Sequence, residues 1–324
     1  MSDPAQLIQK IRATLAPCSL GDWPTPLEPA PGLASAVGVA ELALKREDRA
    51  SASCGGNKVR GLEFLFAGAP PDTVFVTLGG TGSTHCLATA VHAAAVGGRA
   101  VLAQFPQYDT PASRAVAAAC RAQAALVVRA RARGSLPLAL LAAWRRAAAL
   151  GPRRWIPGGG AHPHAVVGQL LGGLELASQV AAPPDAIVLP LGTGGTAAGL
   201  ALAVTALGWP TQVVGVRVAP WLVANGWRTM RLARAARRLL ADRGVPLPAP
   251  RSLHIVDGLG KGYGHPTPEG EAATRLASEH GLTLDPTYGA KAFAFLLQRA
   301  TGNVRRVVFW HTFALPSRAS EPGS

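Results

Sequence analysis

The sequence lacks any segment typical of a membrane span or a secretion signal. Its one long apolar run without charge, residues 186–208, is interrupted by glycine and proline, which suits a buried strand, turn and helix better than a membrane span. The N-terminal segment "MSDPAQLIQKIRATLAP" has an early acidic residue and no long apolar stretch, so it predicts a short amphipathic helix. We therefore expect a cytoplasmic protein without a membrane partner.

Cysteine is scarce and widely spaced. Cys18, Cys54, Cys86 and Cys120 lie more than thirty residues apart, with no C-x-x-C pair and no histidine at ligand spacing. This spacing encodes neither a disulfide framework nor a local zinc site. We expect reduced thiols, mostly buried, and no bound metal.

Acidic residues are few, at 18 against 32 lysines and arginines, which gives a formal charge of +14. Basic residues cluster in "WRRAAALGPRRW" and "GWRTMRLARAARRLLADRG", as they do in some nucleic-acid-binding proteins. However, no aromatic residues alternate with them as in a nucleic-acid groove, and arginine spaced among alanine and leucine is typical of a solvated helix face. We expect no nucleic-acid partner and a small anionic molecule as the ligand.

The 324-residue chain is 48% hydrophobic and alternates short apolar runs with longer Ala/Leu-rich stretches. The runs predicted as buried strands are "TVFVTLGG", "RAVLAQF", "AALVVRA", "AIVLPLG", "TQVVGVRVA" and "RRVVFWH". This alternation indicates a parallel α/β fold, and the length favours two domains. Loops or chain ends are expected at residues 26–32, 105–112, 244–250 and 315–324. Ligands of such folds bind where strands end and helices begin.

The turn "SCGGNKVRGLEF", residues 53–64, places Lys58 after two glycines and Asn57, at the start of a predicted helix. A lysine in this position can be a solvated helix-start residue, a phosphate clamp, or an amine that forms a Schiff base with a carbonyl. The turn alone leaves these three roles open.

A second turn has the composition of an anion cradle. In "LGTGGTAAGLALAV" a predicted strand is followed by Gly192, Thr193, Gly194, Gly195 and Thr196 at the start of a helix. Glycine lets the backbone approach an anion, while hydroxyls and helix-start N–H groups donate to it. The segment has neither the nucleotide P-loop pattern nor the dinucleotide fingerprint, so it predicts another kind of phosphate site.

Two further turns carry polar groups. "TLGGTGSTHCLATAV" presents Ser83, Thr84 and His85 before a predicted helix, and "DPTYGAKAF" presents Tyr288 at a turn, preceded by "GKGYGHPTPEG" with Tyr263. A lone tyrosine is most often a core or turn residue. Two of the chain's three tyrosines fall in these motifs, which favours a functional role.

Seven segments, in this order, resemble the family of 1-aminocyclopropane-1-carboxylate deaminases and D-cysteine desulfhydrases. They are "WPTPLEPAPGL", "LALKREDRASASCGGNKVRGLEFL", "LGGTGSTHCLATAVHAAAVG", "LGTGGTAAGL", "GYGHPTPEG", "DPTYGAKAF" and "FWHTFALP". The resemblance spans residues 24–316 and implies an enzyme with the tryptophan synthase β-like fold, also called fold type II, and pyridoxal 5'-phosphate as cofactor. It further implies a large cofactor-binding domain of residues 1–51 and 163–324 and a small α/β domain of residues 52–162.

The resemblance also implies roles for individual residues. Lys58 is similar to the lysine that holds the cofactor as a Schiff base and acts as acid and base, and Ser83 to a serine near the substrate carboxylate. Tyr263 and Tyr288 match the two active-site tyrosines. His85 either faces the site or is a helix-start residue without a role in it. The implied cofactor-binding set is Asn57, Lys58, Thr84, Gly192, Thr193, Gly194, Gly195, Thr196 and Thr312.

Three positions depart from the family pattern. Thr84 replaces an asparagine that contacts the pyridine ring, and Gly289 replaces a glutamate that faces the pyridine nitrogen in the cyclopropane-opening members. Phe313 replaces a glycine and would narrow the pocket, whereas Thr312 can still reach the nitrogen. Without the carboxylate the ring is a weaker electron sink. We therefore expect β-elimination from a small amino acid such as D-cysteine, by a homodimer.

Other outcomes stay open at this stage. The chain could instead deaminate 1-aminocyclopropane-1-carboxylate, catalyse β-replacement or racemisation, or bind the cofactor without activity. The pocket at Gly289, Thr312 and Phe313 would decide among them.

Overall fold

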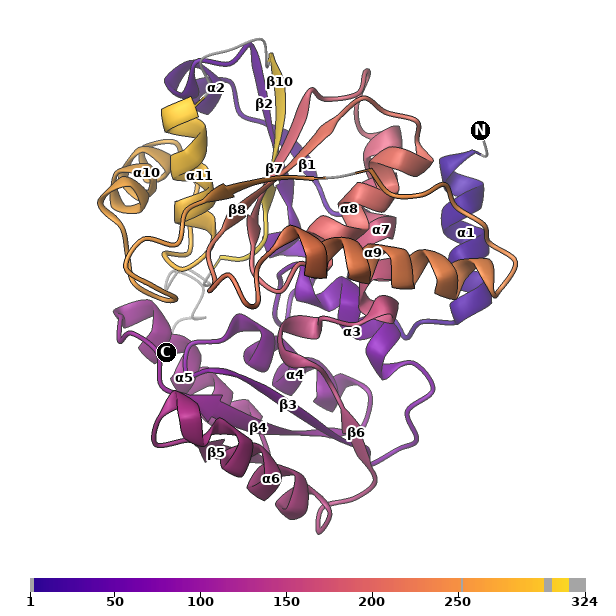
Figure 1. Ribbon diagram of the computed structural model, residues 1–324, viewed down its shortest axis with the longest axis vertical. Coiled ribbons are helices and arrows are strands. Elements are labelled where there is room, and N and C mark those ends of the chain that lie inside the picture. Colours follow the sequence, from indigo (N-terminus) through magenta and orange to yellow (C-terminus); the bar gives the residue numbers. More distant parts are fainter. Residues whose placement is uncertain (1–2, 252, 300–304, 315–324) are drawn as a thin grey trace, which may run out of the picture.

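The computed structural model describes residues 3–251, 253–299 and 305–314 and contains two sheets with helices on their faces (Figure 1). The larger sheet has the strand order β1-β2-β10-β7-β8-β9, and the smaller sheet has the order β5-β4-β3-β6. All neighbours pair in parallel except β1 and β2. The strands of the larger sheet are β1 (Leu27–Pro29), β2 (Glu41–Arg46), β7 (Ala186–Leu191), β8 (Gln212–Arg217), β9 (His254–Asp257) and β10 (Arg306–His311). Those of the smaller sheet are β3 (Val74–Gly80), β4 (Arg99–Phe105), β5 (Leu126–Arg129) and β6 (Arg153–Trp155).

The α-helices cover both faces of each sheet. In Figure 1, α2, α10 and α11 lie on one side of the larger sheet and α7, α8 and α9 on the other. The α-helices are α1 (Pro4–Leu15), α2 (Pro31–Val37), α3 (Lys58–Phe66), α4 (Thr84–Ala95), α5 (Pro111–Gln123), α6 (Leu136–Ala147), α7 (Pro163–Glu175), α8 (Gly195–Ala206), α9 (Gly226–Ala241), α10 (Pro268–Glu279) and α11 (Gly289–Arg299). Short 3-10 helices are η1 (Glu47–Arg49), η2 (Arg133–Ser135), η3 (Gly158–Gly160) and η4 (Leu176–Ser178).

The smaller sheet shows how the apolar pattern builds the core. Along β3, Val74 and Val76 pack with α6, whereas Phe75 packs with α4 on the opposite face. Successive side chains of a strand point to opposite faces, so an all-apolar strand is buried on both sides. The observed pattern is therefore that of a central strand between two helix layers.

All six strands expected from the apolar runs are present, and so is the N-terminal helix. The expectation of a loop at residues 26–32 is wrong, because Leu27–Pro29 pairs antiparallel with β2 and Pro31 begins α2. Proline is tolerated on an edge strand and at the first helical position, so these prolines do not exclude either element. The expected chain end at residues 315–324 lies outside the described residues.

The four cysteines are free thiols, with Cys86 and Cys120 buried and Cys18 and Cys54 half-buried. Across the described ranges, no helix is both long and apolar enough to cross a membrane. Strands β3 to β6 all fall within residues 52–162, which supports our proposal of a small domain there.

The parallel strands bring the polar turns together. β7 ends before Gly192, β10 before Thr312 and β3 before the turn that contains Ser83. Helix α3, which begins at Lys58, lies between the two sheets (Figure 1). The carboxyl ends of strands from both sheets therefore meet at one place, where ligands of α/β proteins bind.

Candidate active site

Two adjoining cavities lie where the strands end. The inner cavity, of about 30 Å³, is lined by residues 190–197 with Asn57, Lys58, Thr84, Tyr288, Thr312 and Phe313. The outer cavity, of about 450 Å³, is wider and shares Lys58, Gly192, Thr193 and Tyr288 with the inner one. The two therefore form one continuous space with a narrow inner end.

Lys58 lies at the junction of the two cavities, as the first residue of α3. Burial lowers the pKa of its amine to about 8, because the charged form loses solvation there. Among the described residues its amine has no hydrogen-bond or ion-pair partner. The amine is therefore neutral in an appreciable fraction near neutral pH and free to react.

Asn57 connects three segments around this lysine. Its backbone N–H donates to Thr312 O at 2.9 Å, and its side-chain Nδ2 donates to Thr196 Oγ1 at 2.7 Å. Gln169 Nε2 donates to Asn57 O at 2.6 Å. These bonds hold the start of α3 against the loop before α8 and the end of β10.

The loop of residues 192–196 and the first turn of α8 form the wall of the inner cavity. Gly194 has φ +89°, and a Cβ there would lie 2.5 Å from Thr229 Oγ1, so only glycine fits. A Cβ on Gly195 would meet nothing closer than Gly160 O at 3.8 Å. The first turn of α8 leaves N–H groups without helical partners, and these groups and the helix dipole attract an anion.

Ser83 and Thr84 begin α4 at the opposite wall. Ser83 caps the helix by accepting a bond from Cys86 N at 3.3 Å, and it lines the outer cavity. Thr84 lines the inner cavity. The structure thus places the serine at the outer cavity and the threonine at the inner one.

His85 also lines the outer cavity, although it is buried. Thr77 Oγ1 donates its only hydrogen to Ile156 O at 2.8 Å. The same oxygen lies 2.9 Å from His85 Nε2 and therefore accepts a hydrogen bond from it. The Nδ1 atom has no partner among the described residues. Burial and the Lys58 charge lower the pKa of His85 to about 3, so the ring is neutral.

Tyr263 and Tyr288 lie on the outer cavity, and their hydroxyl oxygens are hydrogen-bonded to each other. Asp285 holds the turn before α11, because its carboxylate accepts bonds from the N–H groups of Thr287, Tyr288 and Gly289. The turn "DPTY" therefore orients Tyr288 toward the site.

Gly289 does not line either cavity, contrary to the expectation that it shapes the pocket. A Cβ there would lie 3.0 Å from Asp285 Oδ2 and 3.6 Å from Leu284 Cδ2. Thr312 and Phe313 do line the inner cavity, as expected. Phe313 approaches Gly56, where a Cβ would lie 3.2 Å from its ring, so the aromatic ring closes this side.

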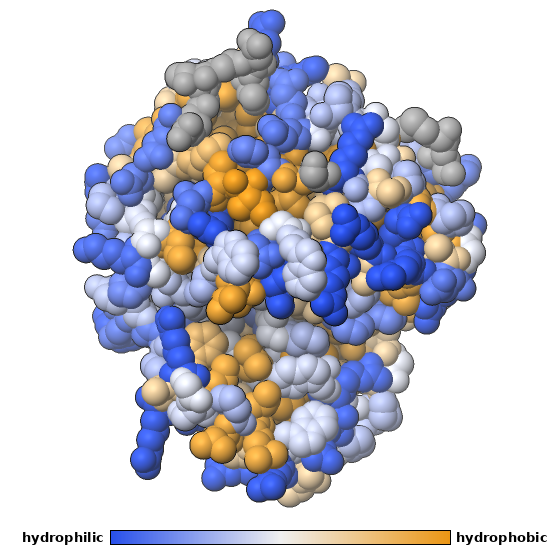
Figure 2. Space-filling model, viewed as in Figure 1, coloured by the Kyte–Doolittle hydropathy of each residue, from blue (hydrophilic) through white to orange (hydrophobic). Residues whose placement is uncertain are grey.

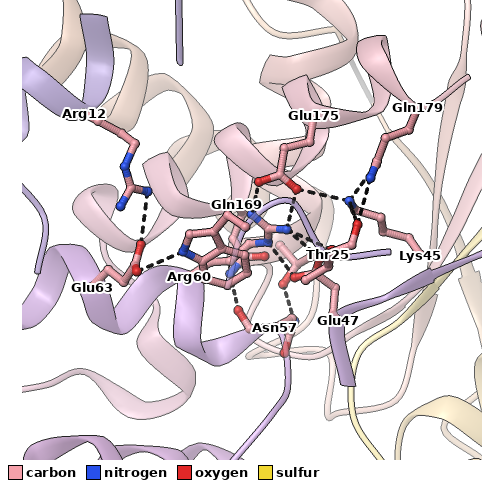
Figure 3. A network of polar contacts seen from close by, with 12 residues as sticks. Arg12, Thr25, Lys45, Glu47, Asn57, Arg60, Glu63, Gln169, Glu175 and Gln179 are labelled. Carbon is pink, nitrogen blue, oxygen red and sulfur yellow. Dashed lines mark hydrogen bonds and ion pairs between the residues drawn. The ribbon is translucent and has the colours of Figure 1, made fainter. Parts of the chain in front are cut away.

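A buried polar network fixes the helix that carries Lys58 (Figure 3). The Arg60 guanidinium donates to Glu47 at 2.6 Å and to Glu175 at 2.7 Å, and it stacks over the Trp23 ring at 4.0 Å. Lys45 Nζ donates to Glu175 at 3.1 Å. Because each buried charge is paired, the network holds α3 to β2 and α7 in a defined position.

Sequence reasoning missed much of the outer cavity, including an aromatic residue and two arginines. Phe105, Arg133 and Arg228 line it, from the end of β4, η2 and α9 respectively. Both arginines belong to basic stretches of ordinary composition. Only the position of η2 and α9 at the cavity distinguishes them from arginines of a solvated face.

Comparisons with known proteins agree with this geometry. Residues 18–312 match the family model described as "Pyridoxal-phosphate dependent enzyme". Nocardicin C-9' epimerase of Nocardia uniformis subsp. tsuyamanensis is 36% identical over 303 residues, which cover 89% of this chain and 90% of that protein. D-cysteine desulfhydrase of Salmonella choleraesuis (strain SC-B67) is 33% identical over 313 residues, which cover 91% and 92%.

Solved structures also match over nearly the whole chain. An ACC deaminase homologue has a TM-score of 0.81 at 27% identity and covers 94% of each chain. The processed form of threonine deaminase isoform 2 from Solanum lycopersicum has a TM-score of 0.65 at 21% identity and covers 98% of this chain and 87% of its own, which shows a shared fold. The predicted fold class and the family resemblance are confirmed.

Proposed function

The chain belongs to the family of pyridoxal-phosphate-dependent enzymes, and from that membership we propose that it catalyses β-elimination from an amino acid to give a 2-oxo acid and ammonia. The observation that carries this proposal is the chemistry of the two cavities. None of the described residues that line either cavity is aspartate or glutamate. The reaction is the one named for the D-cysteine desulfhydrase relative.

The residues of the two cavities fit the cofactor. The inner cavity has room for a group of one or two water volumes, such as a phosphate, at the glycine-rich start of α8. Lys58 presents an unpartnered amine at the junction, and Asn57, Thr84 and Thr312 surround it. When bound, pyridoxal phosphate supplies an electron sink for the charge that develops at the substrate Cα.

Lys58 has two tasks in this proposal. Its neutral amine would hold the cofactor, and once a substrate is bound, Nζ would accept the proton from the substrate Cα. A pKa of about 8 makes both tasks possible near neutral pH. The bonds of Asn57 to Thr196 and Thr312 keep this amine aligned with the phosphate cradle.

Ser83 and the tyrosine pair act on the substrate. The hydroxyl of Ser83 and the N-terminus of α4 bind the substrate carboxylate, because both present donors to the outer cavity. Tyr263 and Tyr288 keep their protons, and one of them donates to the leaving thiolate. In balance, D-cysteine and water give pyruvate, ammonia and hydrogen sulfide.

The absence of a carboxylate from the described lining of both cavities argues against cyclopropane opening. 1-Aminocyclopropane-1-carboxylate has no α-proton, and breaking its carbon–carbon bond needs a strong electron sink. A β-thiol or β-chloro substituent leaves with its own electron pair. The site is therefore better suited to β-elimination.

Epimerisation is a second candidate. The relative at 36% identity is named an epimerase, and two proton-carrying groups, Lys58 Nζ and Tyr288 Oη, line the same cavity. Epimerisation removes and returns the α-proton without a leaving group. Epimerisation would use Lys58 in the same way as β-elimination, but it would not need a group that donates a proton to a leaving thiolate.

One set of assays tests both candidates. The purified enzyme with cofactor should release 2-oxo acid from D-cysteine and β-chloro-D-alanine much faster than from 1-aminocyclopropane-1-carboxylate. D-alanine in deuterium oxide is assayed in parallel for exchange and inversion at Cα. Equal or faster turnover of the cyclopropane substrate would contradict the proposal, and inversion without 2-oxo acid from either β-substituted substrate would establish the epimerase instead.

Two further parts of the proposal concern the whole protein. We propose that it forms a homodimer and acts in the cytoplasm. Sedimentation equilibrium and cell fractionation test them directly.

A further inference from the structure

The outer cavity is larger than D-cysteine requires. Its volume of about 450 Å³ lies in the range of pockets that hold drug-sized ligands, about 300–1,000 Å³. The cofactor ring would occupy only the part near Lys58, Gly192, Thr193 and Tyr288, which both cavities share. The remaining space lies beyond the reacting atoms.

The walls of that remaining space are apolar. Leu78, Phe105, Leu136, Pro220 and Val223 line the outer cavity and are absent from the lining of the inner one. They come from both sides of the molecule, from β3, β4 and α6 on one side and the segment before α9 on the other. An apolar substrate segment would be covered from both sides.

Two arginines complete this outer end. Arg133 and Arg228 line the outer cavity but not the inner one, and both residues are exposed, so they lie where this cavity opens to solvent. Arg133 lies 5.9 Å from the centre of the Phe105 ring, so it stays beside the apolar wall. Figure 2 shows hydrophilic side chains along α9 and hydrophobic ones over α6 on the same face.

These arginines are not used to balance acidic side chains. Within the part of the chain that the structure describes, neither forms an ion pair. The described lining of the outer cavity also contains no aspartate or glutamate. Two cations on opposite sides of an apolar space therefore have no internal anion between them.

We propose that the preferred substrate is an amino acid whose side chain is an apolar segment ending in an anionic group, and that Arg133 and Arg228 bind this anion. The inference rests on the proposed function, since it assigns the substrate class of the same site. The amino and α-carboxyl groups lie at Lys58 and Ser83, and the side chain runs through the apolar part to the mouth. Small amino acids leave that part unfilled and are weak substrates.

The test measures binding of two matched ligands to the holoenzyme by calorimetry. D-2-aminosuberate has a distal carboxylate, and D-2-aminooctanoate has a methyl group instead; neither has a β leaving group. We expect D-2-aminosuberate to bind about tenfold more tightly, because each arginine adds an ion pair at a partly exposed site. Arg133→Ala and Arg228→Ala should each weaken its binding about fivefold and leave D-2-aminooctanoate unchanged.

Matched controls separate recognition from general charge. Arg131→Ala and Arg238→Ala remove exposed arginines near η2 and on α9 that do not line the cavity, and neither should change binding of either ligand. Equal affinity for the two ligands, or equal loss of both in the arginine variants, would overturn the proposal. Release of 2-oxo acid from β-chloro-D-alanine is assayed separately, so failure of the reaction and failure of the substrate class are distinguishable.

Discussion

The hydroxyl oxygens of Tyr263 and Tyr288 lie 2.5 Å apart, although 25 positions separate the two residues in the chain. Both phenols line the outer cavity. Burial raises the pKa of Tyr263 to about 12 and raises that of Tyr288 well above its usual value. Because both phenols stay protonated and share one bond, one proton of the pair remains available to a group in the cavity.

If this proton is donated to the leaving group, loss of a tyrosine hydroxyl should affect substrates with different leaving groups differently. In at least one of the variants Tyr263→Phe and Tyr288→Phe, kcat with D-cysteine should fall about 100-fold, the usual contribution of a positioned acid. Chloride leaves without a proton, so kcat with β-chloro-D-alanine should change little. The variant Tyr108→Phe, outside both cavities, is the control. Equal losses with both substrates would exclude a proton donor role.

Cofactor attachment should depend on a single lysine. Lys58→Ala should abolish the visible absorbance of the holoenzyme, and borohydride followed by peptide mapping should find the cofactor on Lys58 in the unmodified chain. Lys45 and Lys291 are buried and already bonded to Glu175 and Leu259 O, whereas Lys261 is exposed. Lys261→Ala is the matched control and should keep the absorbance. Trapping at any of these three lysines would refute the assignment.

The lowered pKa of Lys58 predicts how the rate of cofactor attachment depends on pH. The pKa of Lys58 is lowered to about 8 by burial, so the neutral fraction should grow about tenfold per pH unit below 8 and then level off. The rate at which the cofactor-free protein gains visible absorbance should follow this curve. A rate that keeps rising to pH 10 would show an ordinary lysine.

The same shift affects stability without cofactor. The folded-state pKa lies below the ordinary value of 10.5, so the unfolded chain binds more protons between about pH 8 and 10.5. The lysine therefore destabilises the folded state fully below pH 8, and this penalty disappears as pH rises through that window. Urea unfolding of the cofactor-free protein should show the gain, and Lys58→Met should remove it.

Gly195 allows a test of the phosphate cradle that leaves the fold intact. A side chain at Gly195 has space, whereas one at Gly194 would collide with Thr229. Gly195→Asp should weaken cofactor binding more than tenfold, because a carboxylate would face the phosphate in a site of low dielectric constant. Gly195→Asn introduces a side chain of the same shape without the charge, so it should weaken cofactor binding less. Equal cofactor affinities of the two variants would show that a negative charge at this position does not weaken cofactor binding.

Arg60 should be important for stability although it contacts no ligand cavity. Arg60→Met leaves Glu47 and Glu175 with fewer partners and should lower the free energy of unfolding by about 3–5 kcal/mol. Arg12→Met breaks a partly exposed pair with Glu63 and should cost less than about 1 kcal/mol. Urea denaturation compares the two, and similar losses would mean that the buried network does not stabilise the fold.

The sequence predicted the strands that are long and apolar, because burial on both faces leaves a continuous signal. It did not predict β1, β6 and β9, which have three or four residues, nor β2, in which only three consecutive residues are apolar. Short strands of this kind depend on pairing with a neighbour. The pattern of a single segment does not contain that information.

Residues that line the cavities were predicted where a motif marks them and missed where only the fold places them at a cavity. Lys58, Ser83 and the cradle lie in recognisable turns, and the structure brings them together. Arg133 and Arg228 occur among many arginines, and nothing local marks them as cavity residues. Gly289 shows the reverse case, since its place in a motif suggested a pocket contact, whereas a Cβ added there would point toward Asp285 and Leu284.

Helix α3 belongs to the cores of both halves of the molecule. Val59 and Leu62 pack with the smaller sheet, Phe64 packs with α7 and α8, and Arg60 pairs with Glu47 and Glu175. A movement that separates the halves must therefore break one set of these contacts and displace Lys58. Because bound cofactor stabilises the folded state by mass action, it stabilises the packing of both cores at once. Loss of the cofactor and loss of packing in either half are therefore coupled.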